Sequence, residues 1–131
     1  MGRAVLLAVI IALASPSASA REIRRDAVPE PLWGTWAPGT DACKEKAALA
    51  IVLSKKAYAG PAGSCDIDYV TEIPARDGPI YSARMRCSGS GVTAKKVANL
   101  IIRPEEAGQA ISAGPAFESL VAYRRCRASN Q

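Results

Sequence analysis

Apolar and polar side chains alternate most regularly in two segments that flank a turn rich in proline and glycine. Every second position from 65 to 73 and from 81 to 87 carries a cysteine, a threonine or an apolar residue, with mostly polar or charged residues between them. A period of two is typical of half-buried antiparallel strands. The six residues at 74–79 (PARDGP) contain the proline and glycine that a chain reversal favours. The pattern predicts a β-hairpin.

One register of this hairpin pairs thiols, opposite charges and apolar side chains at the same time. It places Cys65 opposite Cys87. The same register gives four further pairs: Asp66 with Arg86, Ile67 with Met85, Asp68 with Arg84, and Tyr69 with Ala83. We therefore predict a Cys65–Cys87 disulfide and an ion pair for each aspartate. The inner face is expected to consist of Ile67, Tyr69, Ala83 and Met85.

Shorter apolar segments, separated by turn residues, surround the hairpin. We expect strands at 32–37, 49–53, 57–59, 97–103, 109–112 and 117–126, with one helical turn at 44–48. Short strands at regular spacing favour a closed or two-layered antiparallel architecture. The predicted fold is all-β, a small antiparallel β-barrel or sandwich of roughly seven to eight short strands stapled by disulfides.

The first twenty residues have the composition of a signal peptide. A positive start at 1–3 precedes an apolar run at 4–14 and small residues at 15–20, so we place cleavage between Ala20 and Arg21. An uncleaved anchor is the alternative, although the run is short for a membrane span. We expect a signal peptide at 1–20, a disordered lead-in at 21–31, one β domain at 32–127 and a tail at 128–131. The processed chain should be periplasmic or secreted, not membrane-spanning, and monomeric.

The four cysteines of an exported chain of this size predict two disulfides. With Cys65 and Cys87 joined by the hairpin register, elimination pairs Cys43 with Cys126. The alternative joins Cys43 to Cys65 and Cys87 to Cys126. We expect no metal and no cofactor, because the sequence has no histidine and no CxxC pair.

The residue content also disfavours catalysis. Without histidine, a Ser–His or Cys–His nucleophile cannot form. Asp66 and Asp68 point the same way on a strand, about 7 Å apart, but their predicted arginine partners would keep both ionised. Lysine and arginine exceed aspartate and glutamate by seventeen to twelve, and the excess lies near the two ends of the chain. We predict no enzyme and no specific nucleic-acid partner.

The first strand carries a motif with a family resemblance. Gly34-Thr35-Trp36 (G-x-W), then Cys43, the strand at 51–54 (IVLS) and Cys65 follow one another in this order. This order resembles the bacterial inhibitors of secreted metalloproteases in the calycin group. The resemblance implies a barrel in which Trp36 closes one end and contacts a basic residue of the last strand, Arg124 or its neighbour Arg125. The remaining cysteines depart from that pattern.

Two further likenesses concern small exported bacterial proteins. The Tyr-x-x-Cys ending at 123–126 is similar to that of small Gram-negative proteins without a known activity. The sequence at 88–91 (SGSG) lacks the tyrosine of the S-G-x-x-Y recognition loop in periplasmic C-type lysozyme inhibitors. No binding residue is carried over from either group.

Together these observations favour a non-enzymatic binding module of the bacterial envelope that recognises a protein there or outside the cell. Such a module could inhibit a secreted or periplasmic hydrolase. The alternatives are a barrel that binds a small apolar ligand in its interior, and a binder of anionic surfaces with low specificity.

Overall fold

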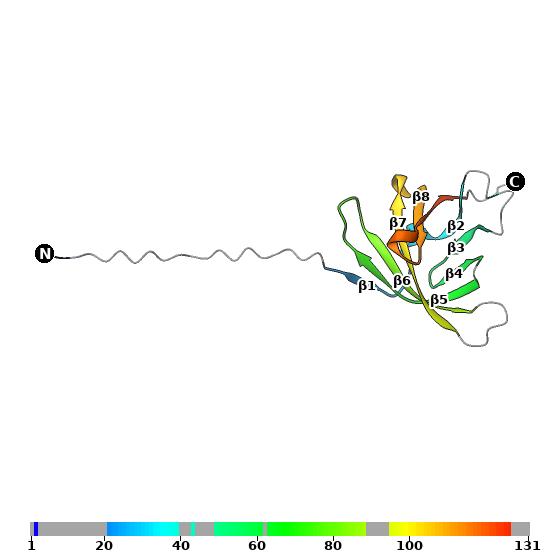
Figure 1. The fold of residues 1–131 in the computed structure, drawn as a ribbon, viewed down its shortest axis with the longest axis horizontal. Coiled ribbons are helices and arrows are strands. Elements are labelled where there is room, and N and C mark those ends of the chain that lie inside the picture. Colours follow the sequence, from blue (N-terminus) through cyan, green and yellow to red (C-terminus); the bar gives the residue numbers. More distant parts are fainter. Residues whose placement is uncertain are drawn as a thin grey trace.

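The structure is a closed antiparallel barrel with one additional strand (Figure 1). It is a computed structural model that describes residues 2, 21–39, 43, 49–61, 63–88 and 95–126. The barrel strands are β2 (Gly34–Ala37), β3 (Ile51–Leu53), β4 (Ala57–Gly60), β5 (Gly63–Ile73), β6 (Ile80–Ser88), β7 (Lys96–Glu105), β8 (Ala110–Gly114) and β9 (Val121–Arg125). The additional strand is β1 (Ile23–Arg25). The all-β barrel prediction is confirmed.

Each barrel strand pairs with the next one along the chain, and β9 returns to β2. This is an up-and-down barrel, in which closure leaves no open edge between the first and last barrel strands. At the seam, Trp36 lies opposite Arg125, and the backbone N–H of Cys126 donates to the oxygen of Thr35 at 2.8 Å. The last strand is shorter than predicted because Phe117–Ser119 forms a 3₁₀ turn (η4). The predicted helical turn at 44–48 lies outside the described residues.

Residues 21–31 are an ordered part of the fold, contrary to the predicted disordered lead-in. Strand β1 pairs with β5, and Glu30–Leu32 forms a 3₁₀ turn (η1). Val28 is only 2% exposed and its N–H donates to the oxygen of Lys55 at 2.9 Å. The charged residues of this segment obscured the apolar side chain of Val28, which belongs to the buried core. The predicted signal peptide, apart from residue 2, and the predicted tail lie outside the described residues.

The hairpin of β5 and β6 keeps the predicted register only in its first half. Cys65 opposes Cys87, Asp66 opposes Arg86, and Ile67 opposes Met85. The register then shifts between Ile67 and Tyr69, so that Tyr69 lies opposite Arg84 and Val70 opposite Ala83. The predicted pairs Asp68–Arg84 and Tyr69–Ala83 are therefore wrong.

Asp68 is the extra residue of this β-bulge, which reverses the face to which every later residue of β5 points. Val70 consequently takes the inner position predicted for Tyr69 and is 1% exposed. Tyr69 is only partly buried, and the guanidinium carbon of Arg24 lies 4.0 Å from the centre of its ring. The bulge therefore gives β1 an aromatic contact on the outside of β5.

The two disulfides are Cys43–Cys126 and Cys65–Cys87, with Cα–Cα distances of 5.7 and 4.0 Å. This pairing confirms the prediction and rejects the alternative connectivity. Two disulfides in one small domain are typical of an oxidising compartment. No helix in the described part of the chain is long and apolar enough to span a membrane.

Packed side chains fill the barrel interior. Trp36 and Ile111 are fully buried, and neighbouring strands contribute further apolar residues that are at most 6% exposed: Ile51, Leu53, Ile67, Val70, Ala83, Met85, Leu100, Ile102 and Ala113. A small barrel of this kind has just enough interior space for its own side chains. These core side chains occupy the interior in which the alternative function would have placed a small apolar ligand.

Candidate functional site

One end of the barrel brings together three turns and the N-terminal segment. In an up-and-down barrel the β3–β4, β5–β6 and β7–β8 turns all lie at the end where β2 begins. The segment from Val28 to Trp33 crosses this end. It is held to the β3–β4 turn by the hydrogen bond between Val28 and Lys55. Residues far apart in sequence therefore form one surface.

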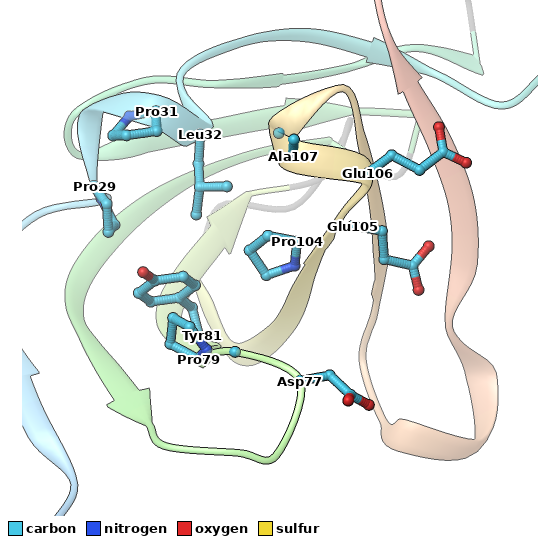
Figure 2. Close-up of a pocket in the computed structure, with 12 residues that line it drawn as sticks. Pro29, Pro31, Leu32, Asp77, Pro79, Tyr81, Pro104, Glu105, Glu106 and Ala107 are labelled. Carbon is cyan, nitrogen blue, oxygen red and sulfur yellow. The ribbon is translucent and has the colours of Figure 1, made fainter.

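This surface contains an open cleft of about 440 Å³. Figure 2 shows apolar side chains on one side of it, with Leu32, Tyr81 and Pro104 facing one another. Leu32 and Tyr81 are buried in the barrel, whereas Pro104 is partly exposed. The lining residues come from three segments: Pro29, Pro31 and Leu32; Asp77, Gly78, Pro79 and Tyr81; and Pro104, Glu105, Glu106, Ala107 and Gly108. A volume of this size lies within the range of ligand sites.

Asp77, Glu105 and Glu106 also belong to the lining, but Figure 2 shows their side chains directed away from the space between Leu32, Tyr81 and Pro104. Two of them are in surface ion pairs: Glu105 with Arg103 at 3.1 Å, and Glu106 with Arg124 at 3.3 Å. Within the described residues Asp77 has no ion-pair partner, and it is exposed on the β5–β6 turn. The cleft is thus apolar inside, and the three carboxylates lie at its outer edge.

The lip of the cleft has an unusual backbone conformation. Glu106 and Ala107 have φ angles of +47° and +52°, and Gly108 follows at +88°. Left-handed backbone is uncommon for residues other than glycine, and such residues gather at functional sites. The N–H of Gln109 donates to the oxygen of Glu106 at 3.1 Å and closes the turn. The β7–β8 turn (η3, Glu106–Gly108) therefore projects Ala107 at the edge of the cleft.

Arg125 connects the core to two segments that line the cleft: residues 29–32, called here the N-terminal wall, and residues 104–108, called the β7–β8 wall. Its guanidinium carbon lies 4.2 Å from the centre of a Trp36 ring. Its three nitrogens donate to backbone oxygens: Pro31 at 2.5 Å, Trp33 at 2.9 Å and Gly108 at 3.3 Å. The indole N–H of Trp36 donates to the oxygen of Leu32 at 3.1 Å. Arg125 therefore fixes both the N-terminal wall and the β7–β8 wall.

Arg125, rather than Arg124, occupies the position that the family resemblance implied. Neighbouring residues of a strand point to opposite faces, so only one of the two can reach Trp36. Arg124 points outward and pairs with Glu106. The resemblance left both arginines open, because the sequence does not show which residue of β9 faces inward, and the contact with Trp36 is made by Arg125.

The predicted charge pairs of the hairpin lie at the other end of the barrel from the cleft. Asp66 opposes Arg86 on the neighbouring strand, but its side chain pairs with Lys95. Arg86 instead bonds Asp68, with Nε and Oδ1 2.9 Å apart. The hydrogen bond and charge of Lys95 lower the pKa of the Asp66 carboxyl. Both aspartates are thus ion-paired, as the prediction required, although with different partners.

Tyr81 is the one buried phenol of the cleft lining. Burial raises its pKa, as do the hydrogen bond and negative charge of Glu72. Glu72 also pairs with Arg25 of β1 at 3.2 Å. The Tyr81 hydroxyl is therefore protonated at neutral pH, and it links the cleft to the contacts of β1.

Among the described residues, no group of three or more histidine, cysteine, aspartate or glutamate side chains is arranged to hold a metal ion. Comparisons with protein-family models, with curated proteins and with solved structures gave no match.

The sequence predictions did not include the cleft. Its prolines and carboxylates look like ordinary turn residues, and its N-terminal wall lies mostly in a segment predicted to be disordered. The one available signal was Val28, an apolar residue in a charged segment four positions before the predicted strand at 32–37.

Proposed function

We propose that this protein is a non-enzymatic binding module, exported to the periplasm or the exterior, that recognises another protein through the barrel-end cleft. The observation that carries the proposal is an open cleft of about 440 Å³ whose inner side chains, Leu32, Tyr81 and Pro104, are apolar or aromatic. Core side chains occupy the barrel interior, whereas this cleft is open and concave and is formed entirely by described residues.

The cleft is rigid enough for selective recognition. Prolines form much of its apolar side, and Arg125 ties its two walls together through backbone oxygens. A surface already in its bound conformation loses little conformational entropy on binding. The two disulfides further suit a module that must persist in an oxidising environment. A secreted or periplasmic hydrolase is the partner class that the sequence resemblance favours.

The test compares two substitutions of proline by phenylalanine. In Pro104→Phe the larger side chain would fill the cleft, because residue 104 faces Leu32 and Tyr81 (Figure 2). In Pro115→Phe the same change falls at the other end of the barrel, on the exposed β8–β9 connection. Oxidised proteins covering residues 21–131 would be immobilised and incubated with the envelope and culture-supernatant fractions. Captured proteins would be identified by mass spectrometry.

We expect the wild type and Pro115→Phe to capture the same partner, and Pro104→Phe to lose at least nine-tenths of it. Circular dichroism and thermal unfolding would establish that both variants are folded. If Pro104→Phe captures the partner as well as Pro115→Phe does, the cleft is not the recognition surface. A captured hydrolase would then be assayed with and without the module.

A further inference from the structure

We propose that the outer face of β1, β5 and β6 carries an anion site, in which the guanidinium groups of Arg24 and Arg84 hold a phosphate monoester beside Tyr69. The residues that line the cleft do not include these three, so this site is separate from the recognition surface proposed above. The proposal follows from the β-bulge in β5, which turns the tyrosine outward and moves a carboxylate away from one of the two arginines.

The bulge at Asp68 creates the arrangement. A regular strand would place Asp68 opposite Arg84, whereas the shifted register places Tyr69 opposite Arg84. Asp68 pairs instead with Arg86, with Oδ1 and Nε 2.9 Å apart. Val70 is buried in the barrel, so its neighbour Tyr69 lies on the outer face by alternation. Bulges are frequent next to functional sites, where they redirect a side chain.

Arg24 approaches the tyrosine from the opposite side. Its strand, β1, pairs with β5 so that Arg24 lies opposite Thr71. Its guanidinium carbon lies 4.0 Å from the centre of the Tyr69 ring. Arg84 lies directly across the β5–β6 ladder from Tyr69, where the β-carbons of paired residues are about 5 Å apart. The two arginines therefore flank one phenol, and an anion beside its hydroxyl group is within reach of both.

Arg24 and Arg84 differ from the other arginines that lie on strands. Each of those others bonds either a carboxylate or backbone oxygens: Arg25, Arg86, Arg103, Arg124 and Arg125. Arg24 and Arg84 are exposed, and neither has a carboxylate partner in the part of the chain that the structure describes. Two positive charges next to one tyrosine are therefore left for a ligand.

The neighbouring side chains add hydrogen-bond donors, which suits phosphate better than carboxylate. Thr71 and Ser82 lie opposite each other on the same outer face, and Asn99 of β7 lies opposite Arg84. A phosphate monoester carries about two negative charges and three acceptor oxygens, so it can contact both guanidinium groups and a hydroxyl group at once. A carboxylate has fewer oxygens, and a single guanidinium group can bind both of them.

The test measures binding of methyl phosphate to the oxidised protein by nuclear magnetic resonance, with acetate at equal ionic strength as the comparison anion. The signals followed are the Nε–H groups of Arg24 and Arg84 and the backbone amide of Tyr69. The variants are Arg24→Gln, Arg84→Gln and the double variant. Arg76→Gln is the matched control: Arg76 is exposed on the β5–β6 turn, and this change removes the same charge without breaking an ion pair between described residues.

We expect saturable shifts of these signals with methyl phosphate and much weaker binding of acetate. Arg24→Gln and Arg84→Gln should each weaken the binding of methyl phosphate about fivefold, as for a well-formed exposed ion pair. The double variant should show no saturable binding, and Arg76→Gln should bind as the wild type does. Circular dichroism and thermal unfolding would establish that all variants are folded.

A phosphate monoester can belong to a soluble compound or to a lipid headgroup, and vesicles distinguish these two sources. Phosphatidylcholine vesicles that contain phosphatidic acid would be sedimented with the wild type and with Arg84→Gln. Retention of the wild type alone would support the site and assign it to a lipid headgroup. Binding of methyl phosphate without retention on vesicles would support the site and assign it to a soluble ester.

Equal weakening by all three single variants would reduce the effect to the general positive charge of the surface and overturn the inference. The absence of saturable shifts with methyl phosphate, or an equal affinity for acetate, would overturn it as well. None of these results alters the comparison of Pro104→Phe with Pro115→Phe, which concerns the cleft, so the inference and the proposed function fail separately.

Discussion

Arg125 should contribute far more to stability than Arg124, although the two are neighbours on β9. The substitutions Arg125→Met and Arg124→Met remove the same charge and add the same side chain. Arg125 donates three hydrogen bonds to backbone oxygens and covers Trp36. Arg124 makes one exposed ion pair, with Glu106 at 3.3 Å.

The magnitude follows from these contacts. A hydrogen bond from a charged donor contributes about 1.5–3 kcal/mol, and a cation–π contact about 0.5–2 kcal/mol. The longest bond, to Gly108 at 3.3 Å, counts for little, and the exposed oxygen of Pro31 regains water when the arginine is removed. We expect Arg125→Met to cost about 2–4 kcal/mol, and Arg124→Met about 0–1 kcal/mol.

Urea unfolding followed by tryptophan fluorescence would measure both losses in the free energy of unfolding. The corresponding fall in Tm is roughly 8–16 °C for Arg125→Met. Hydrogen exchange should also accelerate at Leu32 and Trp33, because the wall that the arginine holds is released. Equal losses for the two variants, or a loss below about 0.5 kcal/mol for Arg125→Met, would refute the assigned role of the guanidinium.

Three further outcomes follow from the structure. Replacing Cys43 and Cys126 together by alanine should lower the free energy of unfolding by about 4–5 kcal/mol, since the bridge closes a loop of 83 residues; a loss below about 2 kcal/mol in chemical denaturation would contradict this estimate. The carboxyl of Asp66 should titrate below its ordinary pKa of 3.8. The contribution of its ion pair to the stability of the folded state is therefore complete above pH 3.8 and disappears as the pH falls through the lowered pKa. Lys95→Gln should return the pKa towards 3.8 in a carbon-detected titration, and an unchanged pKa would reject the pair. Gly34→Ala should lower the free energy of unfolding by about 1–3 kcal/mol, because φ is +133° at this position and the new methyl group would lie 3.1 Å from a guanidinium nitrogen of Arg125. A variant as stable as the wild type in urea would show that the strand can relax.

The sequence was sufficient to predict the hairpin, its disulfide and the barrel class. The hairpin could be predicted because, next to Cys65 and Cys87, the alternation of apolar and polar residues and the cross-strand pairing indicate the same register. The register beyond Ile67 could not be predicted. Bulges depend on how a strand must bend to close the barrel, which is a property of the whole ring. Asp68 looks in sequence like any outward residue of a regular strand.

The cleft was beyond prediction for a related reason. It depends on Leu32, Tyr81 and Pro104, which only closure of the barrel brings together. Most of the N-terminal wall lies in residues 21–31, which were predicted to be disordered because charged residues outnumber apolar ones there. Tertiary burial of Val28 outweighs that local composition. The choice between Arg124 and Arg125 likewise depends on which face of β9 turns inward.

The seam between β2 and β9 has a consequence for the rate of folding. Trp36 and Arg125 are partners across the ring, yet they stand near opposite ends of the described sequence. A contact between residues so far apart in sequence forms only after a long loop has closed, which costs chain entropy. Such contacts are the slow steps in the folding of β proteins. The hairpins between β3 and β8 join neighbours in sequence and can form earlier. An intact Cys43–Cys126 bridge would hold the two sides of the seam close in the unfolded chain, so refolding of the oxidised protein should be much faster than that of the reduced protein.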